Sequence, residues 1–135
     1  MVLVTPSLLI TDDDRDFRET LRDVFEPRGF RTLLAGDGEE ALHVMQHESV
    51  HLVLLDMHMP RLSGLETIRR LKQLQAFTRT PCILMSGALD DAIIAAARQA
   101  NAFSVLAKPL RRGQITDVVS RAMRVTYAWP AADAD

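Results

Sequence analysis

The sequence predicts an α/β protein with a doubly wound sheet of five parallel strands. Short apolar runs alternate five times with longer amphipathic segments along the 135 residues. Successive βα units of this kind form a parallel sheet with right-handed crossovers and helices on both faces. The hydrophobic content of 47% and the charged content of 25% are ordinary for one globular domain of this length.

Each expected strand is a short apolar run that stops at turn residues. The run Leu52 to Leu55 is wholly apolar, as in a buried parallel strand. The expected strands lie near 7–11, 31–35, 51–55, 81–85 and 103–107.

Each expected helix carries apolar residues at helical spacing. In the first helix these residues are Phe17, Leu21, Val24 and Phe25. Gly29 is placed to end that helix, and Gly36-Asp37-Gly38 forms the next turn from strand to helix. The expected helices lie near 14–27, 38–48, 64–76, 89–100 and 111–127.

Charge and cysteine content narrow the class of protein. A net charge of -2 gives no overall field toward nucleic acid or an anionic membrane, so we expect contact with neither. The single cysteine, Cys82, excludes an internal disulfide and is expected to be a small buried hydrophobe. No apolar stretch approaches the ~20 residues that span a bilayer, and no basic segment precedes the first apolar run. We therefore expect a cytoplasmic protein.

Charged residues follow three of the expected strands. Asp56 follows the apolar run 52–55, the first strand runs into Asp12-Asp13-Asp14, and Lys108 follows the last strand. The carboxyl ends of parallel strands are where open α/β sheets place their ligand sites. Carboxylates and an ammonium group brought together there suit a divalent cation and a phosphoryl group.

A carboxylate in such a place can act as a nucleophile toward phosphorus and become an aspartyl phosphate. A Mg²⁺ ion with oxygen ligands neutralises the repulsion between the carboxylate and the phosphate oxygens. Lys108 would meet those oxygens as a point charge, and Ser86 would donate a hydroxyl hydrogen bond. The expected metal ligands are Asp12 or Asp13, Asp56 and the backbone carbonyl of His58.

With these residues, the chain resembles the receiver domains of two-component response regulators. The resemblance covers about residues 7–127 and implies a flavodoxin-like fold with strand order 2-1-3-4-5. The matching segments are Leu8-Leu9-Ile10-Thr11-Asp12-Asp13-Asp14, Ala35-Gly36-Asp37-Gly38-Glu39-Glu40-Ala41-Leu42, Leu54-Leu55-Asp56-Met57-His58-Met59-Pro60, Ser63-Gly64-Leu65-Glu66, Ile83-Leu84-Met85-Ser86-Gly87 and Ala107-Lys108-Pro109-Leu110.

The resemblance also assigns roles to single residues. It makes Asp56 the phosphoacceptor, Ser86 the switch hydroxyl and Lys108 the phosphate-contacting lysine. Asp13 becomes the direct Mg²⁺ ligand, with Asp12 acting through water. The implied protein is a signalling module rather than an enzyme, in which phosphorylation of Asp56 by a histidine kinase switches partner binding.

One position departs from the family pattern. Receivers usually carry Tyr or Phe three residues before the lysine, and this chain has Val105. Val105 is too small and too stiff to act as an aromatic rotamer switch. Two residues next to the expected site have structural roles. Asp14 is expected to cap the first helix, and the Lys108-Pro109 peptide bond is expected to be cis.

Other functions are compatible with parts of the pattern. Asp12-x-Asp14 fits a Mg²⁺-dependent phosphatase of the haloacid dehalogenase type, although Asp56 would then be unexplained. A flavin carrier shares the topology, but three acids after the first strand would repel the flavin phosphate. A degenerate receiver that only binds partners is disfavoured by the complete set of site residues. His43 and His47, four apart on a helix, are expected to be solvated rather than metal ligands.

The expected boundaries are a receiver domain at 1–127 and a tail or truncated linker at 128–135. We expect a sensor histidine kinase or a histidine phosphotransfer protein as partner. In the second case the chain would be a phosphorelay intermediate. A homodimer through the face formed by 89–100, 103–107 and 111–127 is a further expectation.

Overall fold

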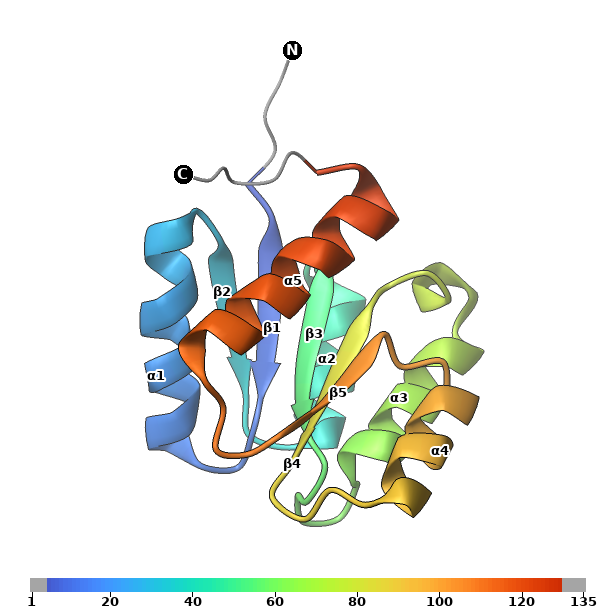
Figure 1. Cartoon of the computed structure of the whole chain (residues 1–135). Helices are drawn as coiled ribbons and strands as arrows, with labels where there is room; N and C mark the ends of the chain where they lie inside the picture. Colours follow the sequence, from blue (N-terminus) through green and yellow to red (C-terminus); the bar gives the residue numbers. More distant parts are fainter. Residues whose placement is uncertain (1–4, 130–135) are drawn as a thin grey trace.

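Five parallel strands form one sheet in the order β2-β1-β3-β4-β5, as predicted, in a computed structural model that describes residues 5–129 (Figure 1). The strands are β1 (Ser7–Thr11), β2 (Arg31–Ala35), β3 (Leu52–Asp56), β4 (Cys82–Ser86) and β5 (Ser104–Ala107). The helices are α1 (Arg15–Phe25), α2 (Gly38–His47), α3 (Gly64–Gln73), α4 (Asp91–Gln99) and α5 (Arg112–Tyr127).

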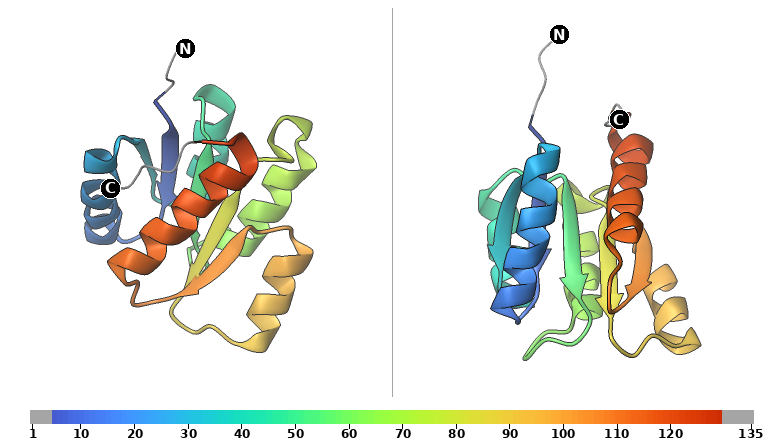
Figure 2. Two further views of the ribbon diagram at one scale, coloured as in Figure 1. Left: turned by 45° about the horizontal axis from the view of Figure 1, so that its top comes forward. Right: turned by 60° about the vertical axis from the view of Figure 1, so that its left-hand side comes forward.

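The sheet divides the core into two layers. Alternate side chains of β1, β3 and β4 point to opposite faces, so each strand contributes to both layers. On one face they pack against α1 and α5, and on the other against α2, α3 and α4. Figures 1 and 2 show these two helical layers with the sheet between them. Every residue of the three central strands is buried, which explains why the middle of each strand is apolar and why polar residues stand only at the strand ends.

The starts of α1, α2, α3 and α4 are capped by short polar side chains. Asp14 accepts hydrogen bonds from the amides of Asp16 and Phe17 and so caps α1, as predicted. Asp37 caps α2 through the amide of Glu40 (2.8 Å), and its other carboxylate oxygen accepts a 2.7 Å hydrogen bond from Arg61. The Asp37 carboxylate therefore joins α2 to the loop between β3 and α3.

Two helices, α1 and α3, end more than one residue earlier than predicted. α1 stops at Phe25, and a 3₁₀ turn (Glu26–Arg28) leads to Gly29 at φ 98°. Pro27 is the reason, because it has no amide hydrogen to donate to the preceding turn of an α-helix. α3 stops at Gln73, where Leu74 turns to an extended conformation before a second 3₁₀ turn (Gln75–Phe77).

At the amino-terminal edge of the sheet, His51 joins β1 to the end of α5. Its Nδ1 accepts a 3.0 Å hydrogen bond from the Ser7 amide, and its carbonyl accepts a 2.6 Å bond from the Tyr127 hydroxyl. Ala128 ends α5 in a left-handed conformation, and Trp129 packs against the core layer of α1 and α5. The rest of the predicted tail, 130–135, lies outside the described residues. Within 5–129, no helix combines the length and the apolar character needed to cross a bilayer.

Candidate functional site

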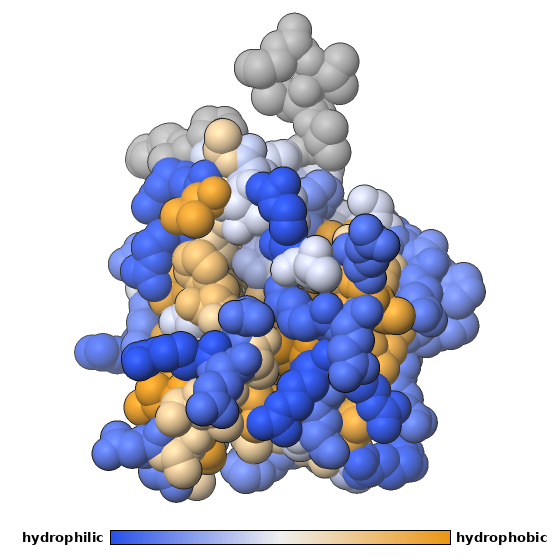
Figure 3. Space-filling model, turned by 90° about the vertical axis from the view of Figure 1, so that its right-hand side faces the viewer, coloured by the Kyte–Doolittle hydropathy of each residue, from blue (hydrophilic) through white to orange (hydrophobic). Residues whose placement is uncertain are grey.

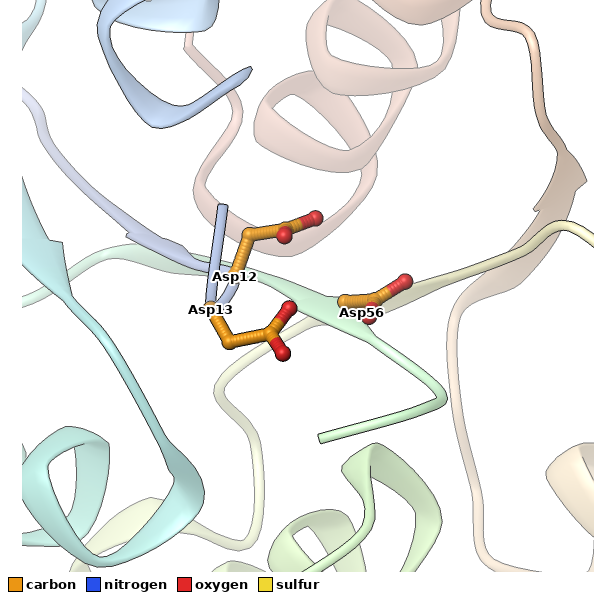
Figure 4. A group of neighbouring side chains, drawn as sticks. All are labelled: Asp12, Asp13 and Asp56. Carbon is orange, nitrogen blue, oxygen red and sulfur yellow. The ribbon is translucent and has the colours of Figure 1, made fainter. Parts of the chain in front are cut away.

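Three carboxylates meet at the carboxyl edge of the sheet. Oxygens of Asp12, Asp13 and Asp56 lie within 4.8 Å of one another (Figure 4). Asp12 directly follows β1 and is 1% exposed, while Asp56 is the last residue of β3 and is 5% exposed. Asp13 is exposed, so the group has two buried members and one open to solvent.

Lys108 joins this group from the end of β5. Its Nζ lies 2.8 Å from Asp12 Oδ2 and 2.9 Å from Asp56 Oδ1. Burial raises the pKa of Asp56, and the charges of Asp12 and Asp13 raise it further against the opposing effect of Lys108. Burial by itself would lower the pKa of Lys108, but the two carboxylates raise it above its usual value. Lys108 is therefore the cation that balances two buried acids.

The loop after β1 is held in place by its own hydrogen bonds. Asp12 Oδ1 accepts a 2.9 Å hydrogen bond from the Asp14 amide, while Arg18 Nη1 donates to the Asp12 carbonyl at 2.6 Å. The Asp12 amide donates to Ala35 at the end of β2 (3.1 Å). These contacts orient the Asp12 side chain toward β3.

The backbone after Asp56 is fixed by two hydrogen bonds and a close helix contact. The Met57 amide donates to Met85 (2.7 Å), and the Gly64 amide donates back to the Met57 carbonyl (3.0 Å). A Cβ atom at Gly64 would overlap the carbonyl oxygen of Asp56 and lie 2.8 Å from Leu84 Cδ1. Only glycine lets the start of α3 approach the phosphoacceptor candidate so closely.

The remaining predicted residues lie around this group rather than within it. Ser86 is buried at the end of β4, and its hydroxyl accepts a 3.2 Å hydrogen bond from the Ala88 amide. The Ser86 carbonyl accepts from the Lys108 amide (2.8 Å), and the Lys108-Pro109 peptide bond is cis. His58 is exposed in the loop between β3 and α3. The structure thus brings Asp12, Asp13, Asp56 and Lys108 into one group, with Ser86 and His58 on neighbouring segments.

The sequence assigned no role at the site to three residues that contact it. The Phe17 ring lies 4.2 Å from Lys108 Nζ, Arg18 holds the Asp12 carbonyl, and Gly64 admits α3 next to Asp56. Phe17 fits the apolar stripe of α1, so its spacing indicated only a core residue. Gly64, at the first position of a helix after Ser63, carried a usable signal, since glycine is favoured where the backbone approaches another group closely.

Other sequence expectations concern residues away from the site. Cys82 is fully buried, and burial raises the pKa of its thiol to about 11. His43 and His47 are exposed, and their rings lie side by side at a tilt of 32°, with centroids 4.2 Å apart.

Val105, the position that departs from the family pattern, borders a hollow between α4 and β5. The hollow has a volume of about 300 Å³. Figure 3 shows this side of the molecule, where hydrophobic patches (orange) lie between hydrophilic residues (blue). The residues that line the hollow are Ile94, Ala97, Arg98, Ala102, Phe103, Ser104 and Val105.

The carboxylate group has the chemistry of a site for a hard divalent cation. Mg²⁺ binds through one or two carboxylates, backbone oxygens and water, and three aspartates within 4.8 Å supply the first of these. The exposed Asp13 leaves one side of the group open for entry.

Comparisons with known proteins identify the family of this chain. A family model described as the response regulator receiver domain matches residues 8–120. Sporulation initiation phosphotransferase F of Bacillus subtilis is 32% identical over 119 residues, which cover 88% of this chain and 94% of that protein. Transcriptional activator protein PfeR of Pseudomonas aeruginosa is 38% identical over 126 residues, or 90% of this chain, but the match spans only 40% of PfeR.

Solved structures agree on the fold. A receiver domain protein from Methanospirillum hungatei superposes with a TM-score of 0.87 at 19% identity, covering 93% of this chain and 98% of that one. A response regulator receiver protein from Pseudomonas putida gives 0.84 at 26% identity, covering 89% and 99%. The chain belongs to the response regulator receiver domain family of two-component signalling.

Proposed function

We propose that this chain is a phosphorylation switch in which Asp56 accepts a phosphoryl group from a phosphohistidine of a sensor kinase. A carboxylate oxygen of Asp56 forms the new O–P bond, and the P–N bond to the donor imidazole breaks. The electron pair of that bond goes to the ring nitrogen, which takes a proton from water. The product is an aspartyl phosphate on Asp56 and a neutral histidine on the donor.

The surrounding residues have separate roles in this proposal. Asp13 and Asp56, with Asp12 through water and the His58 carbonyl, would hold Mg²⁺. When bound, the ion neutralises charge that builds up between the carboxylate and the phosphoryl oxygens. Lys108 contacts a phosphoryl oxygen, and the Ser86 hydroxyl donates a hydrogen bond to another.

The observation that carries the proposal is the pair of contacts made by Lys108 Nζ, 2.8 Å from Asp12 and 2.9 Å from Asp56. At the carboxyl ends of the strands, the two buried carboxylates can hold a cation, and the lysine between them can contact the anionic oxygens of a phosphoryl group. Membership of the receiver family supports the same conclusion.

Intact-mass measurement after incubation with acetyl phosphate and Mg²⁺ tests the proposal. We expect the wild-type protein to gain one phosphoryl group and Asp56→Asn to gain none. Asp14→Asn is the matched control, because asparagine also caps helices and, within residues 5–129, the Asp14 side chain bonds only to amides of α1, so the change removes a neighbouring carboxylate and keeps the backbone contact to Asp12. A phosphoryl group on Asp56→Asn would refute the assignment of the phosphoacceptor. Steady phosphate release from an aryl phosphate would instead support the phosphatase alternative.

A phosphorelay role is a second candidate. It is supported by the 32% identity to a protein named as a phosphotransferase, of which the match covers 94%. In that role the phosphoryl group would pass from Asp56 to a histidine phosphotransfer protein. Loss of label from phosphorylated protein on addition of such a partner, with label appearing on the partner's histidine, would distinguish the relay from a terminal switch.

We also propose that phosphorylation changes association through the face formed by α4, β5 and α5, including homodimer formation. Sedimentation with and without beryllofluoride, a mimic of the phosphoryl group, measures this directly. An unchanged sedimentation coefficient over a wide concentration range would argue against the dimer.

A further inference from the structure

Lys108 has a third partner besides its two carboxylates. The face of the Phe17 ring lies over the ammonium group, with Nζ 4.2 Å from the ring centroid. Phe17 is half-buried, and the Lys108 side chain is 25% exposed. The ammonium is therefore enclosed by Asp12, Asp56 and an aromatic ring, which replaces water on one side.

Phe17 reaches this position through the same loop that supplies the carboxylates. The Asp14 side chain caps α1 and accepts from the Phe17 amide at 3.3 Å, which sets where residue 17 falls on the helix. The next residue, Arg18, fixes the Asp12 carbonyl. One segment, 12–18, thus places both a buried acid and the ring that faces its counter-ion.

The ring makes a contact that the carboxylates cannot replace. Lysine has a long flexible side chain, and ordering it costs conformational entropy. The carboxylates that pair with Lys108 in this structure are those that would hold the metal, so Lys108 loses part of its ion pairing when they turn to that ion. The attraction between a cation and an aromatic face does not depend on those oxygens.

We propose that Phe17 is a positioning residue that keeps the Lys108 ammonium at the site where the phosphoryl oxygens arrive. This inference rests on the proposed function of Asp56. It assigns to α1 a part in phosphoryl transfer through the π face of one side chain. The competing explanation is that Phe17 only fills the core layer of α1 and α5, against which it also packs.

The contact itself is measurable without any phosphoryl chemistry. Lys72 and Lys108 are the two lysines of the chain, so lysine labelled with ¹³C at Cε gives two signals. Lys72 Nζ donates to the Thr78 and Thr80 carbonyls and is the internal control. We expect the Lys108 ε-protons to be shifted upfield by the ring current and to return to ordinary values in Phe17→Leu. Identical Lys108 shifts in both proteins would refute the contact.

The role in positioning is tested by the rate of phosphorylation with acetyl phosphate at saturating Mg²⁺. Leucine keeps the apolar contact with the core and removes the π face, so Phe17→Leu should slow the reaction about two- to fivefold. Phenylalanines with one, two and three ring fluorines at position 17 should slow it progressively, since fluorine weakens the π face with little change in shape. Phe17→Leu should have no further effect in a Lys108→Met background.

Phe103 provides the matched control. It is half-buried, and the Arg121 guanidinium carbon lies 5.6 Å from its ring centroid. Phe103 directly precedes β5, at the amino-terminal end of the strands and away from the carboxylates. Phe103→Leu should therefore leave the rate unchanged. A wild-type protein that takes no phosphoryl group would refute the proposed function of Asp56. If the wild type is phosphorylated and the Phe17→Leu and fluorinated proteins react at the same rate, the role of the ring is refuted and the proposed function of Asp56 stands.

Discussion

Replacing Gly64 by alanine should destabilise the domain, because Gly64 packs directly against the backbone of Asp56, the proposed phosphoacceptor. The added Cβ would overlap the carbonyl oxygen of Asp56 and crowd Leu84 Cδ1 at 2.8 Å. The neighbour it meets first is backbone at the end of a central strand, so it cannot turn aside as a flexible side chain would. The start of α3 has to move away from β3.

The size of the effect follows from three terms. Overpacking a buried site costs about 1–3 kcal/mol of the free energy of unfolding. Loss of the 3.0 Å hydrogen bond from the Gly64 amide to the Met57 carbonyl adds about 0.5–1.5 kcal/mol. The better helix propensity of alanine returns about 1 kcal/mol at most. The net loss is about 1–3 kcal/mol, and a domain of this size loses roughly 4 °C of melting temperature per kcal/mol.

Thermal melting followed by circular dichroism measures the difference. Gly113→Ala is the control, because Gly113 also lies in the first turn of a helix but a Cβ there meets nothing within 4 Å. Gly113→Ala should leave the melting temperature unchanged or raise it, while Gly64→Ala should lower it by about 4–12 °C. If Gly64→Ala melts as high as Gly113→Ala, the close approach of α3 to Asp56 is not a constraint on the fold.

Four other predictions follow from features described above. Burial lowers the pKa of His51 in the folded protein below its usual value of 6.5. The contribution of His51 to the free energy of unfolding is therefore complete above about pH 6.5 and is lost as the pH falls through the lowered pKa. His51→Asn keeps an acceptor without the titration and should flatten the melting temperature between about pH 7.5 and 5. Cys82, with a thiol pKa of about 11, should resist iodoacetamide in the native protein and react once unfolded, as read by mass. Asp13→Ala should weaken Mg²⁺ binding strongly and Asp14→Ala little, as measured by the rise of melting temperature with Mg²⁺, and equal losses would contradict the distinction between ligand and cap. In Val105→Tyr, amide shift changes on adding beryllofluoride should extend from the loop after β4 onto the face of α4 and β5. An unchanged pattern would mean that this position does not limit the switch.

The strand positions could be predicted because they depend on local apolar patterns. The residues of the charged group could be predicted because they follow those strands in a parallel sheet. The apolar run before Asp56 ends at a carboxylate, and parallel strands necessarily bring their carboxyl ends together. Asp12, Asp56 and Lys108 were therefore expected to meet although up to 96 residues separate them. The structure places Asp56 in the last position of β3 rather than just after it, a shift of one residue from the predicted end.

Contacts between elements could not be predicted in the same way. Phe17 lies on the apolar stripe of α1, and nothing in its spacing distinguishes a ring that faces the core from one that also covers a distant lysine. The early end of α1 was predictable, since Pro27 stands two residues after Phe25. The end of α3 at Gln73 carries no comparable signal, because no proline or glycine follows it before the 3₁₀ turn.

The Asp37 carboxylate, which caps α2, also binds Arg61 near the end of the loop between β3 and α3. The loop leaves the sheet at Asp56, passes through Arg61 in a left-handed conformation (φ 68°) and is held there by the 2.7 Å ion pair to Asp37. Its near end begins at Asp56, while its far end is joined through Asp37 to the start of α2. Any displacement at Asp56 must therefore either be absorbed between Met57 and Pro60 or pull on α2. The Arg61 side chain is 67% exposed, so the ion pair is a weak anchor, and a displacement at Asp56 would reach α2 only as long as that pair holds.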